Sequence, residues 1–331
     1  MTANTPTSGG TGEGSNGAIV QVSEYLEAGP VNRVALDLAA AIQRFGGNSK
    51  IVSGGGLMVA EAQRANVEHE TISISSVNPI GNPAGKIAGK LTEWDAQLVH
   101  SHGEDAAGLV IKAVGKHRVP HVVSLYDLPV RRNGKPTPGL QTALKGDRVL
   151  LASPFLQNLL SEAGYLHDVN ASVVPPGLAV NALHPSVVTA ARLTRMVRDM
   201  EITAQSPVII FPAALQDSAG HDAVIEALKQ HLDKTWVCLF IGVGQAERRY
   251  HYRLSQKLEA EGLERRIKIY EGTEDPATLY KLTDIVISTV NGNLAFDYAC
   301  AESQAAGKVV LGANNGSTAF QVDPGVNGAL F

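Results

Sequence analysis

Cysteine is nearly absent from this sequence. The chain has 331 residues and only two cysteines, Cys238 and Cys300, which lack Cys-x-x-Cys spacing. This favours a reducing compartment and a fold without structural disulfides. Both cysteines lie in apolar contexts, so we predict that they pack in cores.

Long apolar runs are also missing. No uninterrupted apolar stretch reaches about 18 residues, which excludes a transmembrane helix. The first sixteen residues are small and polar and have neither the charged region nor the apolar region of a signal peptide, so they predict a flexible tail. We expect a cytoplasmic protein, with peripheral contact at the inner face of the membrane as one option.

Positive charge is scattered. The net charge of -4, with 44% hydrophobic and 18% charged residues, is typical of an ordinary globular protein. No aromatic residues interleave with the basic groups as stacking platforms, so nucleic acid is not expected as a partner. We predict that these groups lie on solvated faces, and an anionic acceptor or membrane surface is the alternative. The groups are Arg131, Arg132 and Lys135, then Arg248 and Arg249, then Arg265, Arg266 and Lys268.

What the sequence does contain is a regular alternation of apolar runs and helical patterns. Such alternation predicts βαβ units and parallel sheets, and the length suits two domains of about 150 residues. The runs are AIVQVS, SKIVSGG, HETISI, AQLVHSH, HVVSLY, RVLLAS and ASVVPPG, then PVIIFPA, TWVCLFIG, RIKIYEG, DIVIST and KVVLGAN.

The alternation is interrupted once, which predicts two α/β, Rossmann-like, doubly wound domains facing a cleft at the carboxyl ends of their strands. After the tail at 1–16, we expect the N-terminal domain at 17–177, an irregular, helix-prone connector at 178–206 and the C-terminal domain at 207–331. The connector carries few strand signals, so limited proteolysis is expected to cut within or near it.

Longer stretches resemble a known family. "DAQLVHSHGEDAAGLVIKAVGKHRVPHVVSLYD" and "VVPPGLAVNALHP" resemble the acceptor half of the family 4 glycosyltransferases, the retaining GT-B type. "CLFIGVGQAERRYHYRLSQKLEAEGLERRIKIYEG" and "AESQAAGKVVLGANNGSTAFQVDPGVNGALF" resemble its nucleotide-sugar half. The resemblance runs in order from about Gly17 to Phe331 and implies the GT-B fold.

The resemblance places the donor diphosphate at "FPAALQDSAGH", residues 211–221. The family usually has an Arg and a Lys there, whereas this chain has Ala214 and Ala219 and keeps Gly220. Each charge-assisted hydrogen bond to a phosphate contributes about 1.5–3 kcal/mol, so two lost cations weaken donor binding by roughly two to four powers of ten. We interpret the stretch as a lost phosphate site, where helix N-terminal amides could still hold a weak pyrophosphate pocket.

Other positions of the family's site also differ. Of its two glutamates eight positions apart, this chain keeps the second, Glu302, and has Leu294 for the first, which faces the donor sugar. Tyr126 replaces the family's histidine, and a turn that is usually Gly-Gly reads Gly29-Pro30. The catalytic residues are therefore unknown.

Several residues remain as donor-site candidates. Glu302, expected to open a helical stretch, either binds the two ribose hydroxyls or is a solvated helix carboxylate. Gly242 and Gly244 resemble the loop that lets a nucleotide approach the backbone, although Gly-x-Gly alone is a weak signature. Asn293, within "NGNLAF" at 291–296, lies where the family loop wraps the sugar or in a plain strand-to-helix turn.

On the acceptor side, "HSHGED" ends a buried strand with His100 and His102 on the same face. The resemblance puts His102 near the acceptor cleft, beside Gly29 and Tyr126. The alternative makes both histidines hydrogen-bonded packing residues. No further metal ligands are suggested, so we expect no metal. Glu104 and Asp105 are predicted to begin a helix and complement its dipole.

The resemblance implies a retaining glycosyltransferase that moves a sugar from a nucleotide-sugar substrate to an envelope polysaccharide, lipopolysaccharide or other glycolipid, without a metal or other cofactor. The competing hypothesis is a catalytically impaired homologue that binds a glycan, a nucleotide or a partner glycosyltransferase. The residues at 126, 214, 219 and 294 favour this second hypothesis. The family's final helices lie beyond Phe331, which implies either a truncated sequence or a partner chain over the exposed apolar faces.

Overall fold

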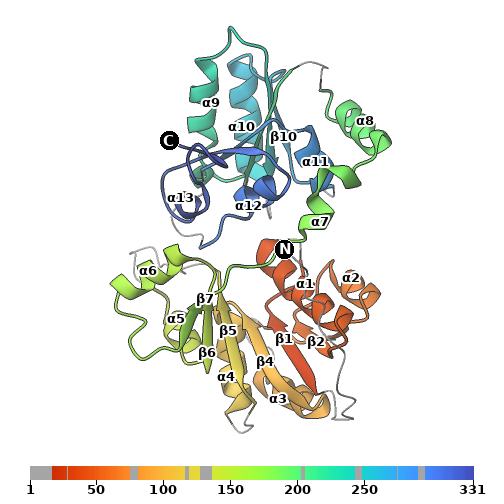
Figure 1. Ribbon diagram of the computed structural model, residues 1–331, viewed down its shortest axis with the longest axis vertical. Coiled ribbons are helices and arrows are strands. Elements are labelled where there is room, and N and C mark those ends of the chain that lie inside the picture. Colours follow the sequence, from red (N-terminus) through yellow and green to blue (C-terminus); the bar gives the residue numbers. More distant parts are fainter. Residues whose placement is uncertain are drawn as a thin grey trace, which may run out of the picture.

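The computed structural model consists of two α/β lobes stacked along the long axis of the molecule, with the chain starting in one and ending in the other (Figure 1). We call them the first lobe, which holds β1 to β7, and the second lobe, which holds β8 to β13. The structure describes residues 17–27, 29–74, 81–115, 119–126, 136–202, 206–242, 248–273, 275–289 and 295–331.

The first lobe is built on a seven-stranded parallel sheet in the order β3-β2-β1-β4-β5-β6-β7. Its strands are β1 (Ala18–Ser23), β2 (Ser49–Ser53), β3 (Glu68–Thr71), β4 (Ala96–His102), β5 (His121–Leu125), β6 (Arg148–Leu151) and β7 (Ala171–Val173). Its helices are α1 (Pro30–Arg44), α2 (Val59–Arg64), α3 (Pro83–Glu93), α4 (Glu104–Val114), α5 (Pro138–Ala143) and α6 (Pro154–Glu162).

The second lobe repeats this order in a six-stranded parallel sheet, β10-β9-β8-β11-β12-β13. Its strands are β8 (Val208–Ala213), β9 (Val237–Gly242), β10 (Ile267–Tyr270), β11 (Ile285–Ser288), β12 (Val309–Gly312) and β13 (Gly328–Leu330). Its helices are η2 (Asp217–Ala219), α9 (His221–Lys229), α10 (Arg248–Ala260), α11 (Pro276–Leu282), α12 (Tyr298–Ala305) and α13 (Thr318–Gln321).

The predicted fold is confirmed, and local chemistry explains where elements begin. Proline occupies the first turn of α3 and α6, where no backbone donor is needed. Asn82 and Ser153 cap these helices by accepting the amide protons of Gly85 and Leu156. Cys238 and Cys300 are fully buried in the second lobe, as predicted for core residues.

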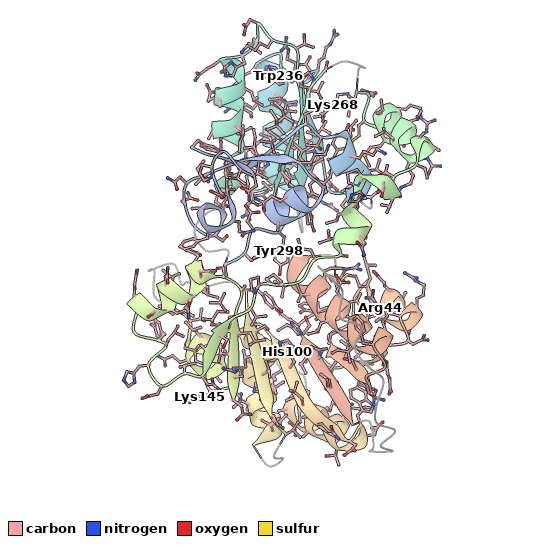
Figure 2. The ribbon with its side chains drawn as sticks, viewed as in Figure 1. Arg44, His100, Lys145, Trp236, Lys268 and Tyr298 are labelled. Carbon is pink, nitrogen blue, oxygen red and sulfur yellow. The ribbon has the colours of Figure 1, made fainter. Side chains whose placement is uncertain are left out.

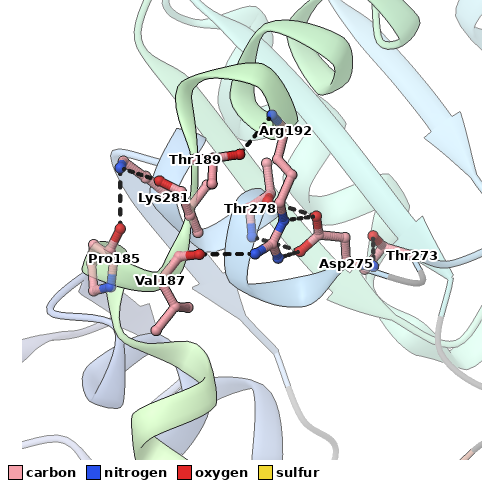
Figure 3. Close-up of polar contacts among 9 residues, drawn as sticks. Pro185, Val187, Thr189, Arg192, Thr273, Asp275, Thr278 and Lys281 are labelled. Atoms are coloured by element: carbon pink, nitrogen blue, oxygen red, sulfur yellow. Dashed lines mark hydrogen bonds and ion pairs between the residues drawn. The ribbon is translucent and has the colours of Figure 1, made fainter.

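The chain between β7 and β8 folds onto the second lobe. It contains α7 (Val180–Leu183), η1 (Pro185–Val187) and α8 (Ala190–Asp199), and Leu183 and Met200 join the second lobe's core. Figure 3 shows the polar contacts that hold it: the Arg192 guanidinium donates to both carboxylate oxygens of Asp275, at 2.9 and 2.5 Å. Lys281 donates to the Pro185 and Val188 carbonyls at 3.1 Å. These contacts hold the segment at 178–206 against α11 and its N-cap residue Asp275.

Candidate active site between the lobes

The strand order locates the site. In each sheet the order reverses at one pair of neighbours, β1 and β4 in the first lobe and β8 and β11 in the second. Ligands of doubly wound sheets bind beyond the carboxyl ends of the strands at such reversals. The sequence candidates near these reversals are His102 and Gly29 in the first lobe and the 214–220 loop in the second, and Tyr126, after β5, reaches His102 with its hydroxyl.

The loop after β8 is held closely by its neighbours. The Thr289 hydroxyl, just beyond β11, donates to the Ala219 carbonyl at 2.8 Å. Gly220 has a φ of 93°, and a Cβ there would lie 2.7 Å from the Thr289 hydroxyl oxygen. Gly220 is therefore required by the backbone, and it leads into the first turn of α9, where amide protons point beyond the strand ends.

A cation that sequence reasoning missed contacts this loop. Arg253 of α10 forms an ion pair with Asp217 and lies over the Tyr250 ring, 5.4 Å from its centroid. Arg248 and Arg249, an alternative source of charge for the loop, occupy the first two positions of α10 and are exposed. The carboxylate of Asp217 already neutralises Arg253, so a diphosphate here would compete with an acidic side chain.

Gly242 ends β9 in a place where no larger side chain fits without movement. A Cβ would lie 3.1 Å from Leu215 and 3.2 Å from the Tyr270 carbonyl. Gly242 thus allows the loop after β8 to pack closely against the end of β9. Gly244, Asn293 and Leu294, three further donor-side positions, lie outside the described residues, as do Arg131, Arg132 and Lys135.

Glu302 is partly buried and, among the described residues, makes one polar contact. Tyr280 of α11, only 4% exposed, donates its hydroxyl to Glu302 Oε2 at 2.8 Å. Burial raises the pKa of Glu302, whereas the Tyr280 hydrogen bond opposes the rise. The expectation that Glu302 opens a helix was wrong, because α12 begins four residues earlier, at Tyr298. No hydrogen bond from a described residue reaches its other oxygen, Oε1.

Asp297, which sequence reasoning missed, fixes the beginning of α12. Its buried carboxylate caps the helix by accepting the Cys300 amide proton at 3.0 Å. It also accepts the hydroxyls of Ser288 and Thr318 at 2.5 and 2.7 Å. Gln321 of α13 exchanges two hydrogen bonds with the Asp297 backbone. This set of bonds ties β11, α12 and α13 together and so positions Glu302.

One contact between the two lobes lies beside candidate positions of both, Tyr126 in the first lobe and Leu294 in the second. The Ala295 amide, the first described group after Leu294, donates to the Tyr126 carbonyl at 2.9 Å. Phe296 packs in the same apolar cluster as Tyr126, Val31 and Val34, and Tyr298 lies between the lobes in Figure 2. The structure therefore brings Tyr126 together with the segment that follows Leu294.

Below this contact, the first lobe holds a buried polar network. His102, 3% exposed, contacts the Tyr126 hydroxyl through Nδ1 at 2.7 Å and Gln21 Oε1 through Nε2 at 2.9 Å. Burial lowers the pKa of His102 well below its ordinary value, so the ring is neutral. The Gln21 oxygen can only accept, which places the ring proton on Nε2 and leaves Nδ1 to accept from Tyr126.

His100 lies on the same face of β4 as His102, as predicted, with ring centroids 4.3 Å apart. It contacts the Ser124 hydroxyl at 2.8 Å, and burial lowers its pKa to about 4. Both histidines are hydrogen-bonded packing residues, and His102 in addition lines a cavity described below. In the described part of the chain, no three His, Cys, Asp or Glu side chains gather as a metal site.

A cavity of about 340 Å³ opens at the strand reversal of the first lobe. It lies beyond β1, β4 and β5 and against the first turn of α1. Glu104 and Asp105, the predicted first residues of α4, are confirmed in that place and line it. The lining residues are Ser23, Glu24, Val31, Asn32, His102, Gly103, Glu104, Asp105, Leu125 and Tyr126.

Gly29, the predicted acceptor-side glycine, caps α1 with an extended φ of 165° that any residue adopts. A Cβ there would meet only the Asn32 amide, at 3.7 Å. Neither conformation nor space therefore requires glycine at this position.

Two of the basic groups are less solvated than predicted. Arg266 donates to the Leu232 and Lys234 carbonyls, and Lys268 donates to the Met200 carbonyl at 3.1 Å. Arg266 thus holds the turn that follows α9, and Lys268 holds the end of α8. Of the helices in the described ranges, none has the length and apolar character to cross a bilayer.

Comparison with known proteins agrees with this architecture. A model of Glycosyltransferase Family 4 matches residues 30–181, and a model of Glycosyl transferases group 1 matches residues 195–331. The chain therefore belongs to the group 1 glycosyltransferases of family 4. No curated protein matches it significantly in sequence.

Solved structures share the two-lobed GT-B fold over nearly the whole chain. A glycosyltransferase from Rickettsia africae has 22% identity and a TM-score of 0.81, covering 94% of this chain and 84% of that one. Anabaena Alr3699/HepE in complex with UDP-glucose has 19% identity and a TM-score of 0.81, covering 95% and 85%. WaaG, a glycosyltransferase involved in lipopolysaccharide biosynthesis, has 15% identity and a TM-score of 0.68, covering 95% and 86%.

Proposed function

We propose that this protein binds a nucleotide sugar in the second lobe and transfers its sugar, with retention, to an envelope glycan or glycolipid held by the first lobe. The observation that carries the proposal is a contact between the lobes near both strand reversals: Ala295, between β11 and α12, donates to the carbonyl of Tyr126, which follows β5, the neighbour of β4. A donor and an acceptor bound at the two reversals would lie on either side of it. The UDP-glucose complex of Anabaena Alr3699/HepE supports this class of donor.

The residues have distinct proposed roles. Glu302 Oε1 accepts a ribose hydroxyl, while Tyr280 holds Oε2. Gly220 and the first amides of α9 approach the diphosphate, and Gly242, with Gly244 and Asn293, frames the nucleoside and sugar. Tyr126 and His102 face the acceptor. Because both ring nitrogens of His102 are hydrogen-bonded, His102 orients the Tyr126 hydroxyl, and both residues present neutral groups to the acceptor. No metal or cofactor is part of this proposal, since the donor itself is the substrate.

In this arrangement the diphosphate of the donor has few positive groups to bind it. Ala214 and Ala219 offer only methyl groups, and Arg253 is paired with Asp217. The charge that develops on a leaving diphosphate is stabilised mainly by fixed positive groups. This favours a second candidate function, an impaired homologue that binds a nucleotide, a glycan or a partner glycosyltransferase without efficient transfer.

Titration calorimetry against UDP, GDP, ADP and their glucose conjugates, followed by product analysis, separates the two. Weak nucleotide binding together with detectable sugar transfer supports the proposed enzyme. Nucleotide or glycan binding without transfer supports the impaired homologue. Binding of none of these nucleotides would contradict the proposed donor site, and transfer at rates ordinary for such enzymes would show that cations reach the diphosphate from elsewhere.

A further inference from the structure

Among the described residues that line the cavity of the first lobe, Glu104 has a buried oxygen without a hydrogen-bond partner. Glu104 Oε2 accepts the Thr137 hydroxyl at 2.6 Å, whereas Glu104 Oε1 is buried without a hydrogen-bond partner among the described residues. Buried polar atoms normally have partners, and a carboxylate oxygen can only accept. A ligand in the cavity that donates a hydrogen bond would satisfy Oε1 of the ionised carboxylate.

The neutral polar groups of the lining already have partners. Ser23 donates to the Tyr25 carbonyl at 3.2 Å, and Asn32 donates to the Glu27 carbonyl at 3.1 Å. His102 and Tyr126 are hydrogen-bonded to each other. Beneath them Gln21, fully buried on the same face of β1 as Ser23, has a side-chain nitrogen without a partner. The neutral polar groups of the described lining are thus hydrogen-bonded within the protein, and Glu104 is the lining residue with an oxygen left for a ligand.

The charged side chains in the described lining of the cavity are all of one sign. Its described lining contains three carboxylates, Glu24, Glu104 and Asp105, and no cationic side chain. Burial, together with the neighbouring charge of Asp105, raises the pKa of Glu24 and raises that of Glu104 to about 7. The carboxylates of Glu24 and Glu104 are therefore held where their charge is poorly compensated. A bound cation would compensate the charge of the desolvated carboxylates and reduce their repulsion, whereas a phosphate would add to the repulsion.

We propose that this cavity binds the amino group of an amine-bearing acceptor sugar, with Glu104 as the residue that selects it. The inference rests on the proposed function, in which the first lobe holds the acceptor, and it specifies that acceptor's chemistry. Glu104 Oε1 accepts a proton from the ammonium group, and Glu24 and Asp105 supply further negative potential. Acetylation of the amine would remove the charge and enlarge the group, and would weaken binding.

The test uses the full chain and three probes, glucosamine, N-acetylglucosamine and glucose 6-phosphate, with binding followed by ligand-observed NMR at low salt. We expect glucosamine to bind at least about fivefold more tightly than N-acetylglucosamine and glucose 6-phosphate to bind most weakly. The Glu104→Gln variant keeps an oxygen for Thr137 and should lose the preference. The matched control Glu162→Gln, an exposed carboxylate on α6, should keep it.

Equal affinity for glucosamine and N-acetylglucosamine, tighter binding of glucose 6-phosphate, or no binding of any probe would overturn the inference. So would an unchanged preference in Glu104→Gln. UDP affinity is measured on the same samples. UDP binding without an amine preference contradicts this inference alone, whereas loss of all nucleotide binding contradicts the proposed function.

Discussion

At the scale of single residues, Glu302 is the described side chain best placed to hold a ribose. We predict that Glu302→Gln lowers UDP or GDP affinity by about tenfold, because an amide accepts hydroxyl protons more weakly than a carboxylate. Thermal stability should hardly change, since the Gln oxygen can still accept from Tyr280. Calorimetric titration and a thermal melt test this together.

The control is Glu264→Gln, an exposed carboxylate of the same lobe. A second variant, Tyr280→Phe, should also weaken nucleotide binding, by about threefold, since it frees Glu302 Oε2 and loosens its orientation. Equal affinity in the wild type and in Glu302→Gln would leave Glu302 a structural carboxylate.

The sequence predicted some site residues better than others. The shared face of His100 and His102 followed from the two-residue period of a strand and is confirmed. The roles of Asp297 and Arg253 could not be predicted, because their partners are distant in sequence and are brought close only by packing. Asp217, for example, lies 36 positions before Arg253. The same limit applied to Glu302, since the start of α12 is set by the contacts of Asp297.

At the scale of elements, the strands were predictable because parallel strands buried on both faces read as short apolar runs. The predicted runs PVIIFPA and DIVIST correspond to β8 and β11. The helices of the segment at 178–206 were harder to predict, because they are held by contacts to α11 that no local sequence pattern reveals. Arg192 and Asp275 make the strongest of these contacts, and their charges give it a pH dependence.

We predict that Arg192→Ala frees the segment around α8. Trypsin or chymotrypsin should then cleave it about three- to tenfold faster than in the wild type, because local opening becomes easier. The control is Arg198→Ala on the same helix, whose ion pair is with the neighbouring, exposed Asp199. Equal cleavage of the two variants would show that the Arg192 contact does not hold this segment.

The same ion pair predicts the direction of a pH effect. The hydrogen bonds from Arg192, the largest cause, lower the pKa of Asp275 from 3.8 to about 2. Because the folded state favours the ionised carboxylate of Asp275, this group adds to the free energy of unfolding above pH 4. The contribution is lost as the pH falls toward 2. Thermal melts of the wild type and Arg192→Ala should therefore differ at pH 5 to 7 and converge near pH 2. A difference that grows on acidification would contradict this account.

At the scale of the whole molecule, Phe296 makes one of the contacts between the lobes, because it packs near α1 of the first lobe and is 9% exposed. We predict that Phe296→Ala weakens the contact between lobes by about 2 kcal/mol, the usual value of burying such a ring. Small-angle X-ray scattering should show a larger radius of gyration. Phe45→Ala, at an 88% exposed ring, is the control and should not change it. An unchanged radius in Phe296→Ala would mean that other contacts set the arrangement.

The central claim is that the loop after β8 faces a diphosphate but lacks the cations to hold it. Calorimetric titration of UDP or GDP into Ala214→Arg with Ala219→Lys, at low salt, tests this most directly. The control, Ala60→Arg with Ala163→Lys, adds the same charges at exposed positions of the first lobe. We predict at least about tenfold tighter binding for the loop variant than for the wild type or the control. A loop variant that folds normally and binds no tighter than the control would contradict the claim.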